Sequence, residues 1–127
     1  MARPAAKDLT ERELEIMHIF WAGGDLTAAD ARERLSESGR ELTYPTVANL
    51  VRTLHEKGFV RPTNDERPFR YIACRTYEEV SGRLLTDLVS RVFRGSREQL
   101  FVRLLDGRKL TAEERAALEA ILQEGSR

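Results

Sequence analysis

The chain has 127 residues, of which 41% are hydrophobic and 33% charged, a composition that excludes a disordered polypeptide and predicts one or two globular domains. The 21 basic side chains equal the 21 acidic ones in number, which excludes a uniformly basic protein of the kind that coats nucleic acid. No apolar run approaches the roughly 20 residues of a transmembrane helix, and the N-terminus lacks an apolar signal-peptide core, so we expect a cytoplasmic protein without membrane insertion.

The first 39 residues predict two helices joined by a short connection. Thr10 and Glu13 have the spacing of a capping box, and apolar residues continue at helical spacing until two consecutive glycines end the helix. Leu26 is expected in a short strand. Thr27 then caps a second helix, which we expect to end near Ser38.

A third predicted helix, residues 44–57, is the most informative segment of the chain. It begins at Thr43 or Tyr44 as the cap, and its apolar residues cluster on one face at helical spacing. Asn49 and Arg52 lie on the opposite face. An amide and a guanidinium are the groups that read base edges in the major groove of DNA, so this face predicts a DNA-reading helix.

Two short apolar segments after this helix, residues 59–63 and 68–72, flank a polar turn and predict a β-hairpin. A reading helix followed by a hairpin is the pattern of a winged helix-turn-helix. Residues 40–76 carry seven basic and four acidic side chains, a net charge of +3, although the whole chain is neutral. The basic excess therefore coincides with the predicted helix and hairpin, which favours DNA binding.

The predicted DNA contacts come from the reading helix and the hairpin. Asn49 is expected to pair with adenine and Arg52 with guanine or a phosphate, while the hairpin arginines hold the DNA backbone or minor groove. The full set is Thr43, Tyr44, Pro45, Thr46, Asn49, Arg52, Thr53, Arg61, Arg67 and Arg70.

From residue 76 onward the pattern is wholly helical, with apolar stripes over residues 77–94, 96–106 and 111–124. About 50 residues are too few to bury these stripes alone, so we expect a homodimer. The residues expected to face the partner are Val80, Leu84, Leu85, Leu88, Val92, Leu100, Phe101, Leu104, Leu118, Ile121 and Leu122. The predicted fold class is mainly α with a small β-hairpin wing (α+β): a winged-helix DNA-binding domain at residues 1–75 and a helical dimerisation region at residues 76–127.

Several motifs can be compared with known families. They are Leu-Thr-Glu-Arg-Glu-Leu-Glu-Ile-Met at residues 9–17 with Trp21, Tyr-Pro-Thr-Val-Ala-Asn-Leu-Val-Arg-Thr-Leu at residues 44–54 with Lys57-Gly58, Arg70-Tyr71, and the segment from Ser96 to Leu105. With these motifs, the chain from about residue 8 to residue 123 resembles the penicillinase-repressor family, the BlaI/MecI-like transcriptional regulators.

The resemblance implies an N-terminal winged helix, a C-terminal helical dimerisation region, and repression by binding a palindromic operator on double-stranded DNA. In that family a membrane sensor-protease, or its effector, triggers cleavage of the repressor within the dimerisation region. By register, the cleaved segment falls near Arg103-Leu104 in this chain, where the best-known members carry Asn-Phe.

The sequence offers no chemistry of an enzyme. Cys74 is the single cysteine, and no nucleophile–base pair, phosphate-cradling loop or metal-ligand spacing is present, so we expect no metal, no cofactor and no catalysis. Two alternatives remain open: a winged helix that contacts another protein, and a regulator that senses a small ligand between the wing domain and the tail without proteolysis.

Overall fold

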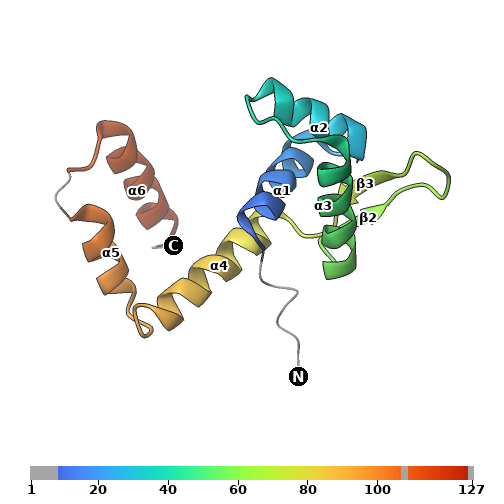
Figure 1. The fold of residues 1–127 in the computed structure, drawn as a ribbon. Coiled ribbons are helices and arrows are strands. Elements are labelled where there is room, and N and C mark those ends of the chain that lie inside the picture. Colours follow the sequence, from blue (N-terminus) through green and yellow to red (C-terminus); the bar gives the residue numbers. More distant parts are fainter. Residues whose placement is uncertain (1–8, 107–108, 126–127) are drawn as a thin grey trace. The chain divides into compact units, whose positions relative to one another are not determined.

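The computed structural model describes residues 9–106 and 109–125, which form six helices and a three-stranded sheet (Figure 1). The elements are α1 (Glu11–Gly23), β1 (Leu26–Thr27), α2 (Ala28–Glu37), α3 (Tyr44–Lys57), β2 (Val60–Pro62), β3 (Arg70–Ala73), α4 (Tyr77–Arg91), α5 (Arg97–Leu105) and α6 (Ala112–Gly125). Within the described ranges, no helix is both long enough and apolar enough to cross a membrane.

The chain divides into two compact units, and the division falls between Gly82 and Arg83, inside α4. This boundary lies later than residue 75, where the sequence analysis places the end of the first domain. The reason is visible at Val80, which is only 7% exposed and belongs to the hydrophobic core of the first unit. The first turn of α4 is therefore part of the winged-helix unit.

The helices of the first unit start at the residues that the sequence predicts, and side-chain hydrogen bonds cap each start. Thr10 and Glu13 exchange hydrogen bonds of 3.1 and 3.0 Å at the start of α1, which confirms the predicted capping box. Thr27 and Asp30 do the same for α2. Thr43, one of the two predicted caps, is the N-cap of α3. These caps define the starts of the three helices that carry the fold.

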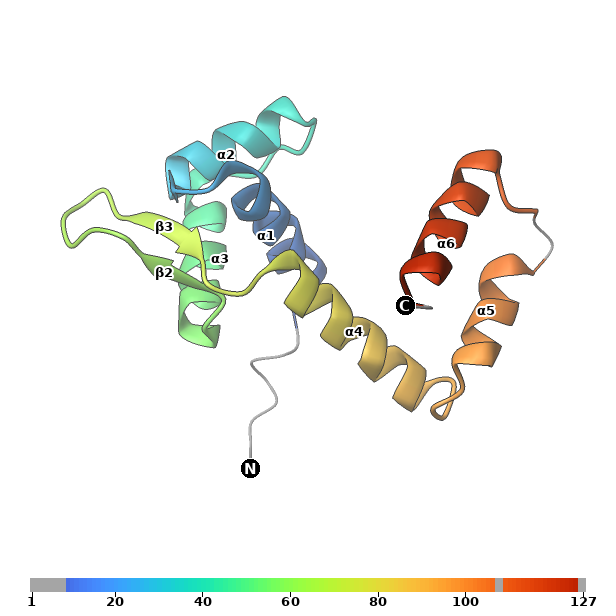
Figure 2. The same ribbon diagram turned by 180° about the vertical axis from the view of Figure 1, so that it is seen from behind.

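The sheet is antiparallel, with the strand order β1-β3-β2. Leu26 pairs with Tyr71, which confirms the predicted short strand. The hairpin strands β2 and β3 are shorter than predicted, because the chain between them forms a longer turn. In Figure 2 this hairpin, which we call the wing (residues 60–73), extends beyond the helices of the first unit.

The core of the first unit lies between α1, α2, α3 and strand β2. Its largest fully buried side chains are Phe20, Ile16, Met17, Leu54, Val47, Val51 and Val60. Burying such a side chain contributes about 1.5–3 kcal/mol, so three of them on one face of α3 hold that helix firmly. The opposite face of α3 consequently points away from the core.

A buried ion pair links the start of α1 to the end of α3. The carboxylate of Glu13 is 6% exposed, and its Oε1 accepts hydrogen bonds from Lys57 Nζ at 2.7 Å and from the Thr10 backbone N–H at 3.0 Å. Gly58 ends α3 at φ 88°, a left-handed conformation that glycine adopts without strain. Both ends of the α3 backbone are thus fixed by local bonds.

In the second unit, the described helices leave most of their large apolar side chains exposed, while Val89 and Leu100 are half-buried. α4 ends at Arg91 rather than at the predicted residue 94, and Ser96 and Thr111 then begin α5 and α6 as predicted. Neither α5 nor α6 buries a described side chain. Large apolar residues that are 38–63% exposed are Leu84, Leu85, Leu88, Val92, Phe101, Val102, Leu104, Leu105, Leu118, Ile121 and Leu122.

Candidate nucleic-acid interface

Helix α3 presents a polar face away from the core. Val47 and Val51 are at most 1% exposed on the inner face, whereas Pro45, Asn49 and Arg52 are exposed on the outer one. Thr46 and Thr53, at the margins of this face, are half-buried. The structure therefore brings Pro45, Asn49 and Arg52 onto one exposed face of α3, whereas Tyr44 lies on the side of the helix that carries Ala48 and Val51.

The two side chains predicted to read bases are bonded to each other. Arg52 Nη2 donates a hydrogen bond of 2.6 Å to Asn49 Oδ1, across the i, i+3 spacing that brings side chains together on a helix. A carbonyl oxygen can accept two hydrogen bonds, and the guanidinium keeps further donors in its planar fork. The geometry makes Asn49 and Arg52 a pair in which the amide holds the guanidinium in place.

At the N-terminus of α3, small polar groups are ordered by the cap. Thr43 Oγ1 accepts from the Thr46 backbone N–H at 3.4 Å and donates to Thr46 Oγ1 at 3.0 Å. Tyr44 is 50% exposed beside them. Helix N-termini of this kind attract phosphate groups, because the unsatisfied N–H groups carry partial positive charge.

Asn64, which no sequence motif singles out, holds the turn of the wing together. Asn64 Nδ2 donates to the carbonyl oxygens of Glu66 at 3.0 Å and Pro68 at 3.2 Å, and Asn64 Oδ1 accepts from the Arg70 N–H at 2.9 Å. An asparagine that bonds its own turn is a common way to fix a loop. The signal available in the sequence is Asn64 itself, at the start of a polar turn between two strands.

The three wing arginines differ in what they contact. Arg61 is exposed on β2, and the Arg67 guanidinium carbon lies 5.6 Å from the centre of the Phe69 ring. Arg70, by contrast, donates to the Asp25 carbonyl at 2.8 Å and pairs with the Asp25 carboxylate at 3.4 Å. Arg70 therefore joins β3 to the turn before β1, a role that the sequence did not predict.

The N-terminus of α2 lies beside the wing and carries a perturbed acid. A hydrogen bond from the Thr27 backbone N–H, with a further one from its hydroxyl, holds the pKa of Asp30 below its ordinary value of 3.8. The positive charges of Arg70 and Arg34 lower the pKa of Asp30 in the same direction. Asp30 is therefore ionised at neutral pH and completes the cap of α2.

Three helices, a small antiparallel sheet with a projecting wing, and a polar outer face on the third helix define a winged helix-turn-helix protein. A comparison with known protein families also indicates a winged-helix DNA-binding protein. The profile of the penicillinase repressor family matches residues 9–124. The chain belongs to this family of DNA-binding winged-helix transcriptional repressors, whose members are not enzymes.

Individual relatives are distant but match over nearly their full length. The chain is 22% identical to the methicillin resistance regulatory protein MecI of Mammaliicoccus sciuri over 115 residues, which cover 91% of this chain and 93% of the relative. It is 21% identical to MecI of Staphylococcus aureus strain N315 over the same shares.

Solved structures with the same fold are also distant in sequence. The complex structure of hsRosR-S4 has a TM-score of 0.56 at 17% identity, and the match covers 99% of this chain and 96% of that chain. A MarR family protein from Bacillus stearothermophilus has a TM-score of 0.50 at 18% identity, covering 95% and 75%. At these identities the likeness supports the winged-helix fold alone.

Proposed function

We propose that the protein represses transcription as a homodimer that binds a palindromic operator. In each protomer α3 enters the major groove, where Arg52 reads a base edge and Asn49, for which the sequence predicts pairing with adenine, holds the Arg52 guanidinium in position. The two half-sites then lie about 34 Å apart, one helical turn, or a small multiple of that distance. The single observation that carries this proposal is the outward polar face of α3, where the two side chains are held together at 2.6 Å.

The remaining proposed contacts position the helix and do not read bases. At the N-terminal end of α3, the proposed phosphate contacts are Thr43, Tyr44 and Thr46. In the wing, Arg61 and Arg67 are proposed to contact phosphates or the minor groove. Pro45 and Thr53 border the groove. Arg70 contributes indirectly, because its bond to Asp25 holds the wing strand β3 in place.

Dimerisation through the second unit is the second part of the proposal. A chain that leaves this many large apolar side chains exposed on α4, α5 and α6 needs a partner surface of similar character. A second copy of the chain supplies it with two-fold symmetry, which matches a palindromic site. Val80, predicted at this interface, is buried in the first unit instead and is left out of the proposed contact surface.

Relief of repression is proposed to follow a cut near Arg103-Leu104, made by a membrane sensor-protease or its effector. This bond lies in the last turn of α5, where Leu104 is 63% exposed, and cutting it separates α6 from the rest of the chain. A chain truncated after Arg103 is expected to lose dimerisation and operator affinity together. An unchanged dimer in sedimentation equilibrium would contradict this part of the proposal.

The test of the repressor proposal is fluorescence anisotropy with the region upstream of the protein's own gene, an unrelated duplex and a salt series. Arg52→Ala is expected to weaken specific binding by about 1–3 kcal/mol, the usual value of one good base contact. Arg12→Ala, which removes an exposed arginine of α1, is the matched control.

Each result has a defined meaning. Specific, salt-dependent binding that Arg52→Ala weakens and Arg12→Ala does not would support the proposal. Equal binding to both duplexes would mean that the upstream region holds no operator, and the test moves to sites selected from random DNA. No binding to any duplex at low salt would overturn the proposal and favour a protein-contacting winged helix.

A further inference from the structure

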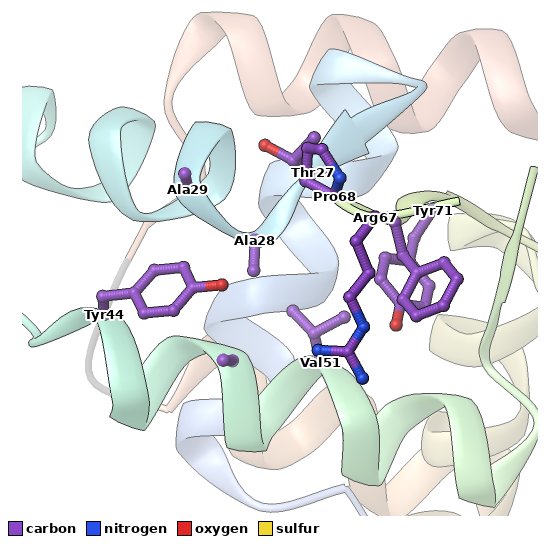
Figure 3. A pocket seen from close by; sticks show the side chains of 10 residues that line it. Thr27, Ala28, Ala29, Tyr44, Val51, Arg67, Pro68 and Tyr71 are labelled. Carbon is purple, nitrogen blue, oxygen red and sulfur yellow. The ribbon is translucent and has the colours of Figure 1, made fainter. Parts of the chain in front are cut away.

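A cleft of about 390 Å³ lies between α2, α3 and the wing, within the first unit (Figure 3). We call it the α3–wing cleft. Its lining residues are Thr27, Ala28, Ala29, Tyr44, Ala48, Val51, Arg67, Pro68, Phe69 and Tyr71. The volume lies in the range of pockets that hold small molecules. The ligand-sensing alternative places a cavity between the wing domain and the tail, whereas this cleft is formed by the wing domain itself.

The walls of the cleft are largely apolar, with two polar groups that converge on it. Figure 3 shows the Tyr44 hydroxyl and the Arg67 guanidinium directed into the cleft from opposite ends, with Val51 of α3 between them. Phe69 and Tyr71 form an aromatic wall, their ring centres 6.5 Å apart in an edge-to-face arrangement. An apolar cavity with a few convergent polar groups is the usual form of a small-molecule site.

The charge of the cleft is positive. Arg67 is the one charged side chain among the lining residues, and none of them is acidic. The N-terminus of α2 adds no attraction, because the ionised carboxylate of Asp30 already caps it at the Thr27 N–H. The Arg67 guanidinium carbon lies 5.6 Å from the centre of the Phe69 ring, a cation–π contact that holds the charge at the cleft. The cleft therefore favours an anion.

The aromatic wall selects among anions. An inorganic phosphate would satisfy Arg67 but leave the rings of Phe69 and Tyr71 uncovered, and it would fill little of a cleft of about 390 Å³. A planar ring against that wall, with a carboxylate toward Arg67 and a polar substituent toward the Tyr44 hydroxyl, would use every convergent group.

We propose that the α3–wing cleft binds a small aromatic carboxylate and that this ligand and DNA exclude each other. The second part rests on the proposed function, because Tyr44 and Arg67 are also proposed DNA contacts. A ligand that engages both side chains withdraws them from the phosphates and holds the wing against α3. Binding of either partner then weakens binding of the other by the same factor.

Binding to the cleft is tested without DNA, by titrating benzoate into the ¹⁵N-labelled full chain and following its amide resonances. We expect saturable shifts of the cleft residues, weakened about tenfold or more in Arg67→Met, which keeps the aliphatic stem but removes the charge. Ala48→Leu fills the cleft without changing its charge and is expected to abolish the shifts. Arg75→Met, an exposed arginine outside the cleft, is the control and should bind benzoate like the wild type.

Two further probes separate the contribution of the charge from that of the aromatic ring. Cyclohexanecarboxylate has the charge without the aromatic ring, and inorganic phosphate has the charge alone. Weaker binding of both than of benzoate would support the proposal. Equal binding of phosphate would overturn it in favour of a simple anion site, such as a seat for a DNA phosphate. Absence of saturable shifts, or shifts that persist in Arg67→Met and Ala48→Leu, would overturn it as well.

The competition is then measured by anisotropy with an operator duplex. Saturating benzoate is expected to weaken operator binding of the wild type and to leave that of Ala48→Leu unaltered by the ligand. Benzoate binding with no effect on operator affinity would overturn the exclusion. If the wild type binds no DNA, the proposed function fails, while the resonance titration still decides whether the cleft holds the ligand.

Discussion

The hydrogen bond between Arg52 and Asn49 leads to a quantitative prediction about how the two residues act. If Arg52 reads the base and Asn49 holds it in position, removing Asn49 matters only while Arg52 is present. The perturbations are Asn49→Ala, Arg52→Ala and the double variant. Both side chains are exposed and lie opposite the core, so these changes should leave the free energy of unfolding within about 0.5 kcal/mol of the wild type.

The expected magnitudes follow from the contacts. Arg52→Ala removes a charged donor from a base edge and should cost about 2 kcal/mol of operator binding, which is roughly a 30-fold rise in Kd. Asn49→Ala removes the 2.6 Å bond that positions the guanidinium and should cost about 1 kcal/mol. In the double variant there is no guanidinium left to position, so the total should stay near 2 kcal/mol and the coupling energy near 1 kcal/mol.

The assay is anisotropy with a labelled operator and an unrelated duplex at two salt concentrations, together with thermal unfolding of each variant. A double variant that loses about 3 kcal/mol, the sum of the two single losses within about 0.5 kcal/mol, would show that Asn49 and Arg52 contribute to binding independently, which contradicts the positioning role of Asn49. Asn49 would then read its own base. Equal losses on both duplexes would instead mean that the pair contacts phosphates.

Three further predictions concern stability and assembly. Lys57→Met leaves the Glu13 carboxylate buried without its 2.7 Å partner and should lower the free energy of unfolding by about 3 kcal/mol in urea denaturation. Arg12→Met, an exposed control on α1, should change it by less than about 0.5 kcal/mol, and equal losses in the two variants would contradict the role of the ion pair. Because the folded state lowers the pKa of Asp30 below 3.8, the ionised carboxylate stabilises the fold above that pH, and this contribution is lost as pH falls through the lowered pKa. Asp30→Asn should therefore reduce the dependence of the free energy of unfolding on pH in that acid range, and an unaltered dependence would contradict the role of Asp30 as a helix cap. Leu88→Asp should dissociate the dimer in sedimentation equilibrium and reduce operator affinity while the first unit stays folded. Thr86→Asp, on the same helix, is the control and should leave the dimer intact, whereas a dimer that survives Leu88→Asp would exclude this part of α4 from the interface.

Features of the fold that depend on neighbouring residues could be predicted from the sequence. The capping box at Thr10 and the cap at Thr27 each need only three or four residues of context, and the two-sided pattern of α3 needs only the helix itself; all three are present as expected. The limits of the wing strands were wrong by a few residues. They depend on how Asn64 bonds across the turn, which a pattern of apolar residues does not encode.

In the candidate site too, features set by neighbouring residues could be predicted, whereas contacts between distant residues could not. Helical spacing places Asn49 and Arg52 on one exposed face, but their mutual bond depends on the rotamers of two side chains. The bond from Arg70 to Asp25 joins residues 45 positions apart in the chain, so no local pattern announces it. Val80 shows the matching limit for apolar residues, because periodicity identifies a buried side chain without saying which core buries it.

In the proposed dimer, two copies of α3 read two half-sites on one face of the DNA. This arrangement is tested by inserting about 5 and about 10 base pairs between the half-sites of an operator and measuring the dimer's affinity for each duplex by anisotropy. A 5-base-pair insertion turns one half-site to the opposite face, so we expect it to reduce affinity to nearly that of an unrelated duplex, with partial recovery at 10 base pairs. Equal affinity for all three spacings would contradict this arrangement.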